Sequence, residues 1–468
     1  MLEDTVLRGG YCVGCGACTA VEHSPYKMAF SQYGMFSAEN VAGDGQVNRL
    51  GAYRVCPFSE SDKCESRIAS TLYGSACNYD EHVGYYQNCY AGFVNDFGLR
   101  SNSSSGGMVT WLSQKLLREG FISAVIHVGM RRESDKNLFS YCVSFDEEQI
   151  FARSKTRYYP IEMSVVLDHV RRVPGRYLFV GLPCFSKAVR LLQEEDRQYK
   201  ERIPYVFSLF CGHLKSSRFS DNFAWQQGIF PGTLSEIDFR HKLPDRLASD
   251  YAVEMIGETE EGVRRIVSPA RKMFGSNWGH MFFAYKACDY CDDIVGECSD
   301  ASFGDAWLPQ FVNDPKGTSI VITRNIEIQN LVAIGMRKKE LMLYDISNDA
   351  LVRSQAGNFR HRRDGLSYRL YKLEQKGIWH PPKRVQARYS HLDQTRRAIY
   401  DLRQRIRRES HTLFLKAIEN RDYNYFVRHL SPLTRRHDRL GQPLIRGALG
   451  RAKRLALGLL HRLKTVPK

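Results

Sequence analysis

The stretch RYLFVGLPCFSKAVRLLQEE, residues 176–195, contains the pattern that decides the fold. It begins with a short apolar run typical of a buried strand, and a tight turn follows. Beyond the turn, apolar residues recur at helical spacing, which predicts a helix. A strand that turns directly into a helix is the unit from which α/β sheets are built, so the stretch predicts an α/β fold.

The same alternation continues on both sides of this stretch. Upstream, a polar loop with glycines leads into a predicted helix over about 108–119, and AVIHVG at 124–129 is a predicted strand. Downstream, YVFSLFCG at 205–212 is the next predicted strand. Strands that alternate with helical periods indicate an α/β body over roughly 85–330.

The composition favours a soluble globular protein with reduced cysteines. Of the 468 residues, 43% are hydrophobic and 25% are charged. There is no apolar run of about eighteen residues and no signal-peptide pattern, so we expect a cytoplasmic protein. The cytoplasm keeps thiols reduced, so the 13 cysteines indicate metal or redox chemistry rather than disulfides.

The formal charge of +16 is concentrated near the C-terminus. From Arg384 to Lys468 there are 21 Lys or Arg residues against 6 Asp or Glu residues, so the remaining body is nearly neutral. Arg-rich helical stretches are predicted at 388–408, 411–430 and 444–464. Any argument from charge to an anionic partner therefore applies to this segment alone.

The last of these stretches has the pattern of a basic amphipathic helix. Its apolar residues are Ile445, Leu449, Leu455, Leu459 and Leu463, and its basic residues are Arg446, Arg451, Lys453, Arg454 and Arg462. Such a helix fits an anionic membrane surface, which would place the protein at the inner face of the membrane, or an acidic partner such as ferredoxin. A solvated extension is the simpler alternative. No recognised nucleic-acid module accompanies the charge, so nucleic acid is not expected as a partner.

Three cysteines lie close together in GGYCVGCGACTAV, residues 9–21. Cys12, Cys15 and Cys18 form C-x2-C-x2-C, a spacing that lets a short loop wrap three corners of an iron–sulfur cubane. Gly14 and Gly16 allow the positive backbone angles that such a loop needs.

The fourth ligand has to come from elsewhere in the chain. In bacterial ferredoxin motifs it precedes a proline, and Cys56-Pro57 fits this rule, so we expect Cys56 to complete a 4Fe-4S site. Cys64 is the weaker substitute. Zinc is the alternative metal, although zinc sites usually pair C-x2-C with a second such pair.

A second set of cysteines lies in the α/β body. Cys184 and Cys211 each follow an apolar strand, and Cys288 and Cys291 form a C-x2-C pair. Ligands gather at the carboxyl ends of parallel strands, so these four thiols are predicted to hold a second 4Fe-4S cluster. Cys298 is near enough in sequence to replace one of them. The alternatives are small buried cysteines, or a nucleophilic Cys184 at a helix start.

The loop before the first predicted helix is a candidate phosphate site. Arg100 is followed by SNSSSGG, which opens directly into the helix at Met108. Hydroxyls, glycines and a helix N-terminus together suit a phosphate, and Arg100 can add positive charge. A serine loop that only caps the helix is the alternative, and the pattern is not a dinucleotide fingerprint.

Several stretches, taken in order, resemble one known family. They are YCVGCGAC, SSSGGMVTWL, ARSKTRYYP, YLFVGLPCFSKAVRLL, FSLFCGHLKS, IDFRHK, KACDYC, and DASFGDAW with GTSIVITRN. Over about residues 10–326 the chain is similar to the coenzyme F420 hydrogenase/dehydrogenase beta-subunit family of iron–sulfur flavoproteins. Its relatives include archaeal F420-reducing subunits, ferredoxin-dependent vinyl reductases and products of bacterial exopolysaccharide genes.

The resemblance implies FAD and its contacts. The FAD phosphates would lie near Ser105, Gly106 and Gly107, with Ser154 and Lys155 near the flavin, while Asp305 matches the D-I-S-x-G-D segment of the family. Candidate proton donors are Asp305, Lys155 and His213, although each fits a structural or flavin-contact role more readily.

Two departures bear on the substrate. Thr156 stands where the family usually has tyrosine, and Phe185 stands where it usually has glutamine after the GLPC cysteine. No particular substrate therefore follows from the resemblance.

The expected organisation has four parts. Residues 1–80 would form a ferredoxin-like iron–sulfur module, 81–330 the α/β (α+β) domain for FAD and the second cluster, 331–383 an irregular connecting segment, and 384–468 a basic helical extension. The expected function is an oxidoreductase that moves electrons between ferredoxin or a deazaflavin and a small molecule or lipid-linked sugar, in exopolysaccharide biosynthesis. The alternatives are an electron-transfer subunit without a substrate site and a non-redox protein with structural clusters.

Overall fold

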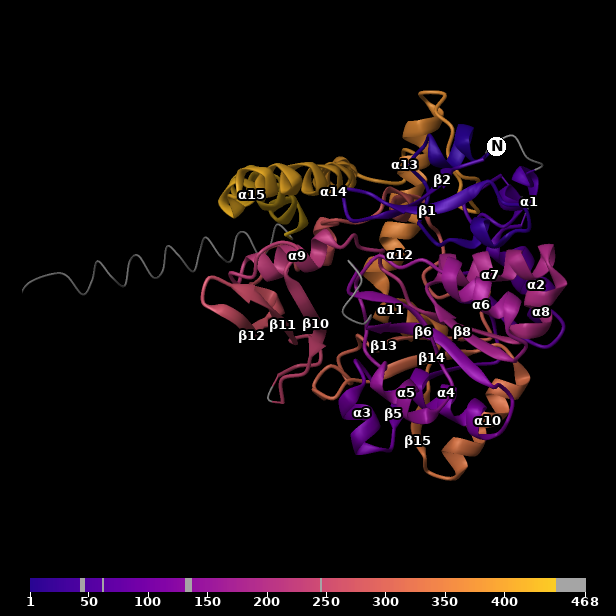
Figure 1. Cartoon of the computed structure of the whole chain (residues 1–468). Helices are drawn as coiled ribbons and strands as arrows, with labels where there is room; N and C mark the ends of the chain where they lie inside the picture. The colour runs from indigo at the N-terminus through magenta and orange to yellow at the C-terminus, as the bar shows by residue number, and fades with distance from the viewer. Residues whose placement is uncertain (43–46, 61–62, 131–136, 245, 443–468) are drawn as a thin grey trace, which may run out of the picture.

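The computed structural model of the chain describes residues 1–42, 47–60, 63–130, 137–244 and 246–442. An eight-stranded mixed sheet lies at its centre, and a smaller lobe carries a three-stranded sheet and two long helices (Figure 1). The alternation of strands and helices in the sequence is thus confirmed as a mixed α/β fold. In the described ranges, no helix is long and apolar enough to cross a membrane.

The central sheet has the strand order β15-β5-β14-β13-β9-β8-β6-β7. Its strands are β5 (Asn88–Val94), β6 (Ala124–Met130), β7 (Phe139–Ser144), β8 (Tyr177–Gly181), β9 (Tyr205–Leu209), β13 (Ala301–Asp305), β14 (Ser319–Thr323) and β15 (Leu341–Asp345). β6, β8, β9 and β13 are parallel to one another, and the remaining pairs are antiparallel. The parallel strands therefore end at the same edge of the sheet, which is where ligands bind in open α/β folds.

Helices cover both faces of this sheet. α4 (Met108–Arg118) and α10 (Ile326–Arg337) pack on one face. α6 (Ser164–Arg172) and α7 (Pro183–Glu195) pack on the other, and α11 (Asn348–Ser354) and α12 (Ala356–Arg362) cover its far end. The remaining helices of the body are α3 (Phe97–Asn102), α5 (Glu147–Ala152), α8 (Arg197–Arg202) and α13 (Asp364–Glu374). In β14, Val321 packs into the core beneath α4 and α10, whereas Ile320 and Ile322 pack into the core beneath α11 and α12. This follows because successive side chains of a strand point to opposite faces of the sheet.

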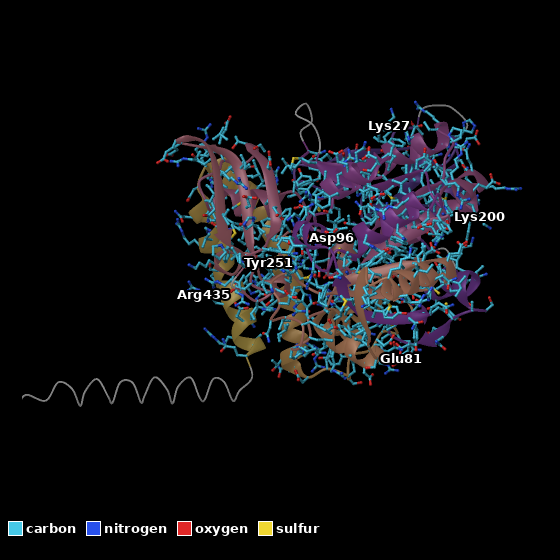
Figure 2. The ribbon with its side chains drawn as sticks, turned by 90° about the horizontal axis from the view of Figure 1, so that it is seen from below. Lys27, Glu81, Asp96, Lys200, Tyr251 and Arg435 are labelled. Atoms are coloured by element: carbon cyan, nitrogen blue, oxygen red, sulfur yellow. The ribbon has the colours of Figure 1, made fainter. Side chains whose placement is uncertain are left out.

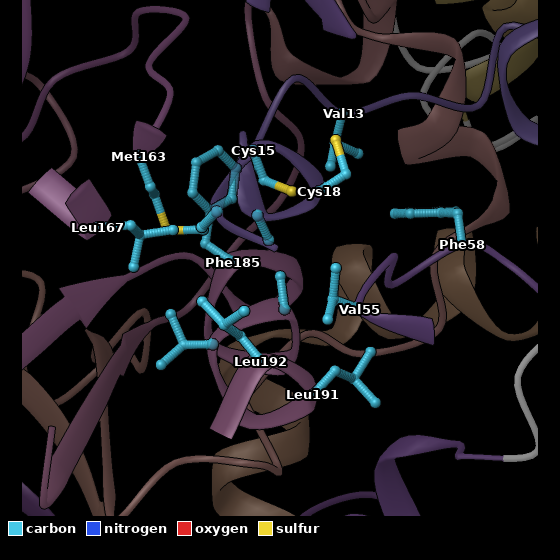
Figure 3. Close-up of a cluster of buried hydrophobic side chains, with 14 of the residues drawn as sticks. Val13, Cys15, Cys18, Val55, Phe58, Met163, Leu167, Phe185, Leu191 and Leu192 are labelled. Atoms are coloured by element: carbon cyan, nitrogen blue, oxygen red, sulfur yellow. The ribbon is translucent and has the colours of Figure 1, made fainter. Parts of the chain in front are cut away.

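The N-terminal segment packs directly on the body. Its elements are the hairpin β1 (Tyr26–Phe30) and β2 (Phe36–Asn40), α1 (Arg49–Arg54), α2 (Glu65–Tyr73), and the hairpin β3 (Asn78–Asp80) and β4 (Gly84–Tyr86). Figure 3 shows Cys15, Val55 and Phe58 of this segment in one apolar cluster with Phe185 and Leu192 of α7. One continuous core therefore joins the thiol-bearing N-terminus to the sheet.

The smaller lobe contains most of the basic C-terminal segment. It consists of α9 (Arg218–Trp225), β10 (Leu234–His241), β11 (Ala252–Thr259), β12 (Gly262–Pro269), α14 (Gln394–Asn420) and α15 (Tyr423–Gly441). Phe414 and Phe426 are fully buried against this lobe's apolar core, and Tyr251 and Arg435 mark the lobe in Figure 2. Up to residue 442 the basic segment is thus a packed helical hairpin rather than a solvated extension.

Some predicted boundaries differ from the observed ones. The expected break near residue 410 lies at Arg421, whose φ of 53° ends α14, and the helix expected at 444–464 falls outside the described residues. The segment 331–383, expected to be irregular, holds β15 and the short helices α11, α12 and α13. Their apolar spacing is interrupted by charged residues, so burial of Phe359 and Leu366 stabilises them.

The candidate phosphate loop is also shorter than expected. Residues 97–102 form α3, which begins where the Asp96 carboxylate accepts a hydrogen bond from the Leu99 N–H. Only 103–107 remain as a loop before α4, and the predicted helix over 108–119 is confirmed.

We expect Phe426→Ala to destabilise the smaller lobe by about 3–5 kcal/mol, because it leaves a cavity among fully buried rings. The Phe426 ring lies 5.2 Å from that of Phe414 and 5.7 Å from that of Phe283. Denaturant unfolding followed by tryptophan fluorescence measures the change, because Trp225 contacts Phe414. Phe97→Ala is the control, since Phe97 is 74% exposed and its loss should cost less than about 0.5 kcal/mol. Equal stability of the two variants would contradict the packing of α15.

Candidate functional site

The first four predicted thiols come from two neighbouring loops. Cys12, Cys15 and Cys18 lie on a loop that ends in the 3-10 turn η2 (Ala17–Ala20), and Cys56 follows α1. Gly14 and Gly16 have φ of 69° and 84°, so the predicted positive angles are confirmed. A Cβ on Gly14 would also lie 2.5 Å from the carbonyl oxygen of Phe36, so the loop requires glycine there.

These four thiols lie close enough to affect one another. Burial raises the pKa of Cys18 well above its usual range, and the charges of Cys15, Cys12 and Cys56 raise it further. Burial likewise raises the pKa of Cys56 to about 12. The Gly14 N–H donates to the Cys12 Sγ at 3.4 Å, a contact typical of metal-bound thiolates. Such a set becomes stable as thiolates only with a cation among them.

The second four thiols meet at the carboxyl ends of β8 and β9. Cys184 lies in the first turn of α7 and Cys211 follows β9, while Cys288 and Cys291 lie in and after the 3-10 turn η5 (Lys286–Tyr290). Burial raises the pKa of Cys184, and Cys291, Cys211, Cys288 and then Cys15 raise it further. Cys184 is therefore near the other three thiols of its own set and near Cys15 of the first set.

Two further cysteines lie apart from these sets. Cys64 occupies the N-cap position of α2. The Cys298 thiol is fully buried 3.9 Å from the carbonyl oxygen of Glu65, and its charged neighbours are Glu65, Asp293, Lys187 and Glu297. The structure thus groups Cys56 rather than Cys64 with the first loop, and Cys184, Cys211, Cys288 and Cys291 without Cys298.

The spacing of the thiols argues against a single zinc ion. Bonds of about 2.3 Å to a tetrahedral zinc hold the sulfurs about 3.8 Å apart. Over the described ranges, the only groups of three ligand atoms within 4.8 Å of one another are His280 with His437 and Asp438, and Asp238 with His241 and Glu254. In the described ranges, neither thiol set therefore has three sulfurs as close together as in a tetrahedral zinc site.

A cavity of about 260 Å³ opens beside the second thiol set. It lies between the loop 103–107, the segment 153–159 and the ends of β8, β9 and β13. The predicted residues Ser105, Gly107, Ser154, Lys155 and Asp305 line it, together with Cys211. The sheet edge therefore brings the candidate cofactor residues and a candidate metal ligand to one space.

Two of the predicted cofactor residues stand behind this lining. The Arg100 guanidinium lies 2.6 Å from the Asp314 carboxylate and donates to the carbonyl oxygen of Gly317. The Gly106 N–H donates to the Ser319 hydroxyl at 3.0 Å. Both residues hold the loop in place, and Arg100 contributes charge from behind it.

Two cations near the loop were not predicted as site residues. Arg240 pairs with Asp305 at 3.0 Å, and the Lys242 ammonium donates to the carbonyl oxygen of Arg100 at 2.7 Å. Burial, together with the positive charges of Lys155, Arg100 and Arg240, lowers the pKa of Lys242 to about 7. The basic residues at the end of IDFRHK could have revealed them: Arg240 lies in β10, which ends at His241, and Lys242 follows it directly.

The inner end of the cavity also has polar groups that lack partners. His213, Lys215, Trp278 and Arg157 line it. Within the described parts of the chain, the His213 Nε2 and the Arg157 Nε and Nη1 have no hydrogen-bond partner. Buried polar groups are normally satisfied, so this end of the cavity fits a polar ligand.

Comparisons with known proteins place this architecture in a class of redox subunits. The profile described as "Coenzyme F420 hydrogenase/dehydrogenase, beta subunit N-term" matches residues 89–168, and the companion profile for the carboxyl-terminal part of the same beta subunit matches residues 175–349. Together the two matches cover more than half of the chain, so the chain belongs to the coenzyme F420 hydrogenase/dehydrogenase beta-subunit family. A general oxidoreductase role follows from this membership.

One similar solved structure is a chain of the F420-reducing [NiFe] hydrogenase complex of Methanosarcina barkeri. It is 17% identical, with a TM-score of 0.48, and the alignment covers 67% of this chain and 100% of that one. A search of curated proteins found no match.

Proposed function

We propose that the protein is an iron–sulfur flavoprotein that moves electrons between a one-electron donor and a two-electron acceptor. The observation that carries the proposal is the continuity of three sites. Cys15 of the first thiol set lies near Cys184 of the second, and Cys211 of the second set lines the cavity of Ser105 and Lys155. Clusters carry single electrons, whereas a flavin exchanges them for a hydride.

The first thiol set would hold one 4Fe-4S cluster and the second set another. The spacing of the thiols in both sets and their N–H contacts to sulfur support this assignment. Two thiols of the first set, Cys12 and Cys56, are partly exposed, against only Cys184 of the second set. The first set would therefore be the side from which an external donor such as ferredoxin delivers electrons.

The cavity would hold FAD. Ser105 and Gly107, before the N-terminus of α4, would bind its phosphates, with charge from Arg240, Lys242 and Arg100. Ser154, Lys155 and Asp305 would contact the flavin end. The cations around the loop and the unpartnered donors of the inner end are the features that fit an anionic dinucleotide.

We propose a separate role for each of the four segments of the chain. Residues 1–80 would be the electron-entry module, sharing its core with 81–330, which would hold FAD and the second cluster. Residues 331–383 would support the cluster side of the body, and residues 384–442 would support the smaller lobe; the rest of the predicted extension over 384–468 lies outside the described residues. The resemblance to the family is the basis for proposing a sugar substrate and a role in exopolysaccharide synthesis. The basic amphipathic pattern of the C-terminal sequence is the basis for proposing a membrane contact.

The second candidate is an electron-transfer subunit with no substrate of its own, which the family membership favours. Anaerobically purified protein distinguishes the two candidates. Reduction of a small molecule or deazaflavin by the isolated chain supports the first, and electron transfer only to a co-purified subunit supports the second. If the protein is reduced and no absorption band of an iron–sulfur cluster bleaches, both candidates are contradicted.

We expect Cys15→Ser and Cys291→Ser each to lose one cluster, or about four iron atoms of eight, because each removes a ligand of a different set. Iron and sulfide analysis with EPR of the reduced protein measures the loss. Cys64→Ser and Cys298→Ser are the controls and should keep the iron content of the unsubstituted chain. Iron loss in a control as large as in Cys15→Ser would overturn the ligand assignment.

We expect the affinity for FAD to fall as the pH rises above about 7. Below pH 7, Lys242 is protonated both with and without FAD. Above pH 7, Lys242 of the flavin-free protein is mostly neutral, so it must take up a proton before it can pair with the phosphates. The dissociation constant of flavin-depleted protein should rise by up to about tenfold per pH unit between pH 7 and 9. Lys242→Met should bind more weakly and lose this slope.

Lys200→Met is the matched control, because the Lys200 side chain is exposed on α8 and does not line the cavity; Figure 2 shows it at the outer edge of the body. Fluorescence quenching of FAD measures binding in each variant. The same slope in Lys242→Met as in the unsubstituted chain would show that Lys242 does not face the phosphates.

A further inference from the structure

A buried arginine reaches the second thiol set from outside the family-matched residues. Arg362 ends α12, beyond the match at 175–349, and is 1% exposed. Its Nη2 lies 4.0 Å from the Cys211 Sγ and donates to the carbonyl oxygens of Gly212 at 2.6 Å and Cys211 at 3.2 Å. The contact thus places a full positive charge beside a candidate metal ligand.

The rest of the guanidinium has no partner in the described ranges. The Nε and Nη1 of Arg362 are buried without a hydrogen bond, and no carboxylate there lies within 4.0 Å of the group. Two nearby arginines do have carboxylate partners: Arg384 pairs with Glu297 at 2.7 Å, and Arg407 pairs with Asp289 at 2.8 Å. Buried charges are normally paired, so Arg362 needs a negative partner that the protein's carboxylates do not supply.

The thiols of the second set lie on and beside the loop that this guanidinium bonds. The Leu214 N–H donates to the Cys288 Sγ at 3.2 Å, so the loop 211–214 joins Cys211 and Cys288 next to Arg362. Two other buried cations nearby have partners: Lys383 pairs with Asp292 at 3.9 Å, and Lys215 donates to the carbonyl oxygen of Phe282 at 2.6 Å. Arg362 reaches the set with two donors that have no partner in the described ranges.

We infer that Arg362 is the charge and hydrogen-bond partner of an iron–sulfur cluster held by Cys184, Cys211, Cys288 and Cys291. This inference rests on the proposed function. Four thiolates give a cluster net negative charge, and the free Nε and Nη1 donors can bond its sulfurs or ligating thiolates. Arg362 is therefore a tuning residue that acts on the cluster rather than on a substrate.

The expected effect is on the reduction potential. With both clusters bound, reduction of the second would add one electron, which the first would supply from the side of Cys15. A fixed positive charge stabilises the more negative, reduced form and raises its potential. Arg362 thus favours electron flow from the partly exposed first set toward the cavity.

The C-terminal helices hold this charge in place. Arg369 of α13 donates to the carbonyl oxygen of Asp289 at 2.7 Å, and Arg407 of α14 pairs with the Asp289 carboxylate. Asp289 lies between Cys288 and Cys291 in the sequence. The segment beyond residue 349 therefore clamps the metal-binding loop and presents Arg362 to it.

The test is a redox titration of the anaerobic holoprotein followed by EPR. It is done in the Cys15→Ser background, which leaves only the second cluster's signal. Arg362→Gln should lower the ratio of reduced to oxidised cluster at a fixed potential at least tenfold, or about 59 mV for one electron. Arg362→Lys keeps the charge and should keep most of the potential.

Arg360→Gln is the matched control, because Arg360 lies on the same helix α12 but its side chain is exposed, so the variant removes the same charge without touching the loop of the thiols. It should leave the potential unchanged. An unchanged potential in Arg362→Gln, or an equal shift in Arg360→Gln, would overturn the inference. If Arg362→Gln loses the cluster, Arg362→Lys tests the inference instead. A retained cluster with an unshifted potential supports a role for the positive charge, and a lost cluster contradicts that role.

Failure of the proposed function gives a different result. If no second cluster is present in the unsubstituted chain under reconstitution, the ligand assignment itself fails before any potential is measured. If the cluster is present and its potential does not depend on Arg362, only the inference about Arg362 fails.

Discussion

The parallel strands β8 and β9 end side by side, and the rest of the site depends on this constraint. Because both strands run in one direction, Cys184 and Cys211 leave the sheet at the same edge, beside the cavity. α7 then packs against the N-terminal loop, which brings Cys15 to Cys184. A shift of either strand would separate the two thiol sets from each other and from the loop 103–107.

Burial of charge is the second organising feature. The thiols are buried with their pKa values raised, so ionising them costs free energy that positive groups offset. Arg362 faces the second set, while Lys187 is bonded to Glu65 near the first. Around the loop, Arg240 and Lys242 would offset the negative charge of the proposed ligand.

Local sequence patterns predicted those elements that are stabilised by interactions between residues close together in the sequence. The turn from β8 into α7, the helix at Met108 and the positive angles of Gly14 and Gly16 are all confirmed. Cys56 was preferred over Cys64 from a proline alone, and the structure places it with the loop. The short helices α11, α12 and α13 were missed because their sequence periodicity is weak and burial, rather than propensity, stabilises them.

The sequence by itself determined which residues can do the chemistry: the spaced cysteines, the serine–glycine loop and the α/β alternation. The tertiary structure decided which of them meet. It placed Cys298 beside Glu65 rather than in the second set, set Arg100 behind the loop, and brought Arg362 from a distant helix to Cys211. Thiol spacing along a chain is a local property, whereas the charges that surround a buried site come from whichever segments pack against it.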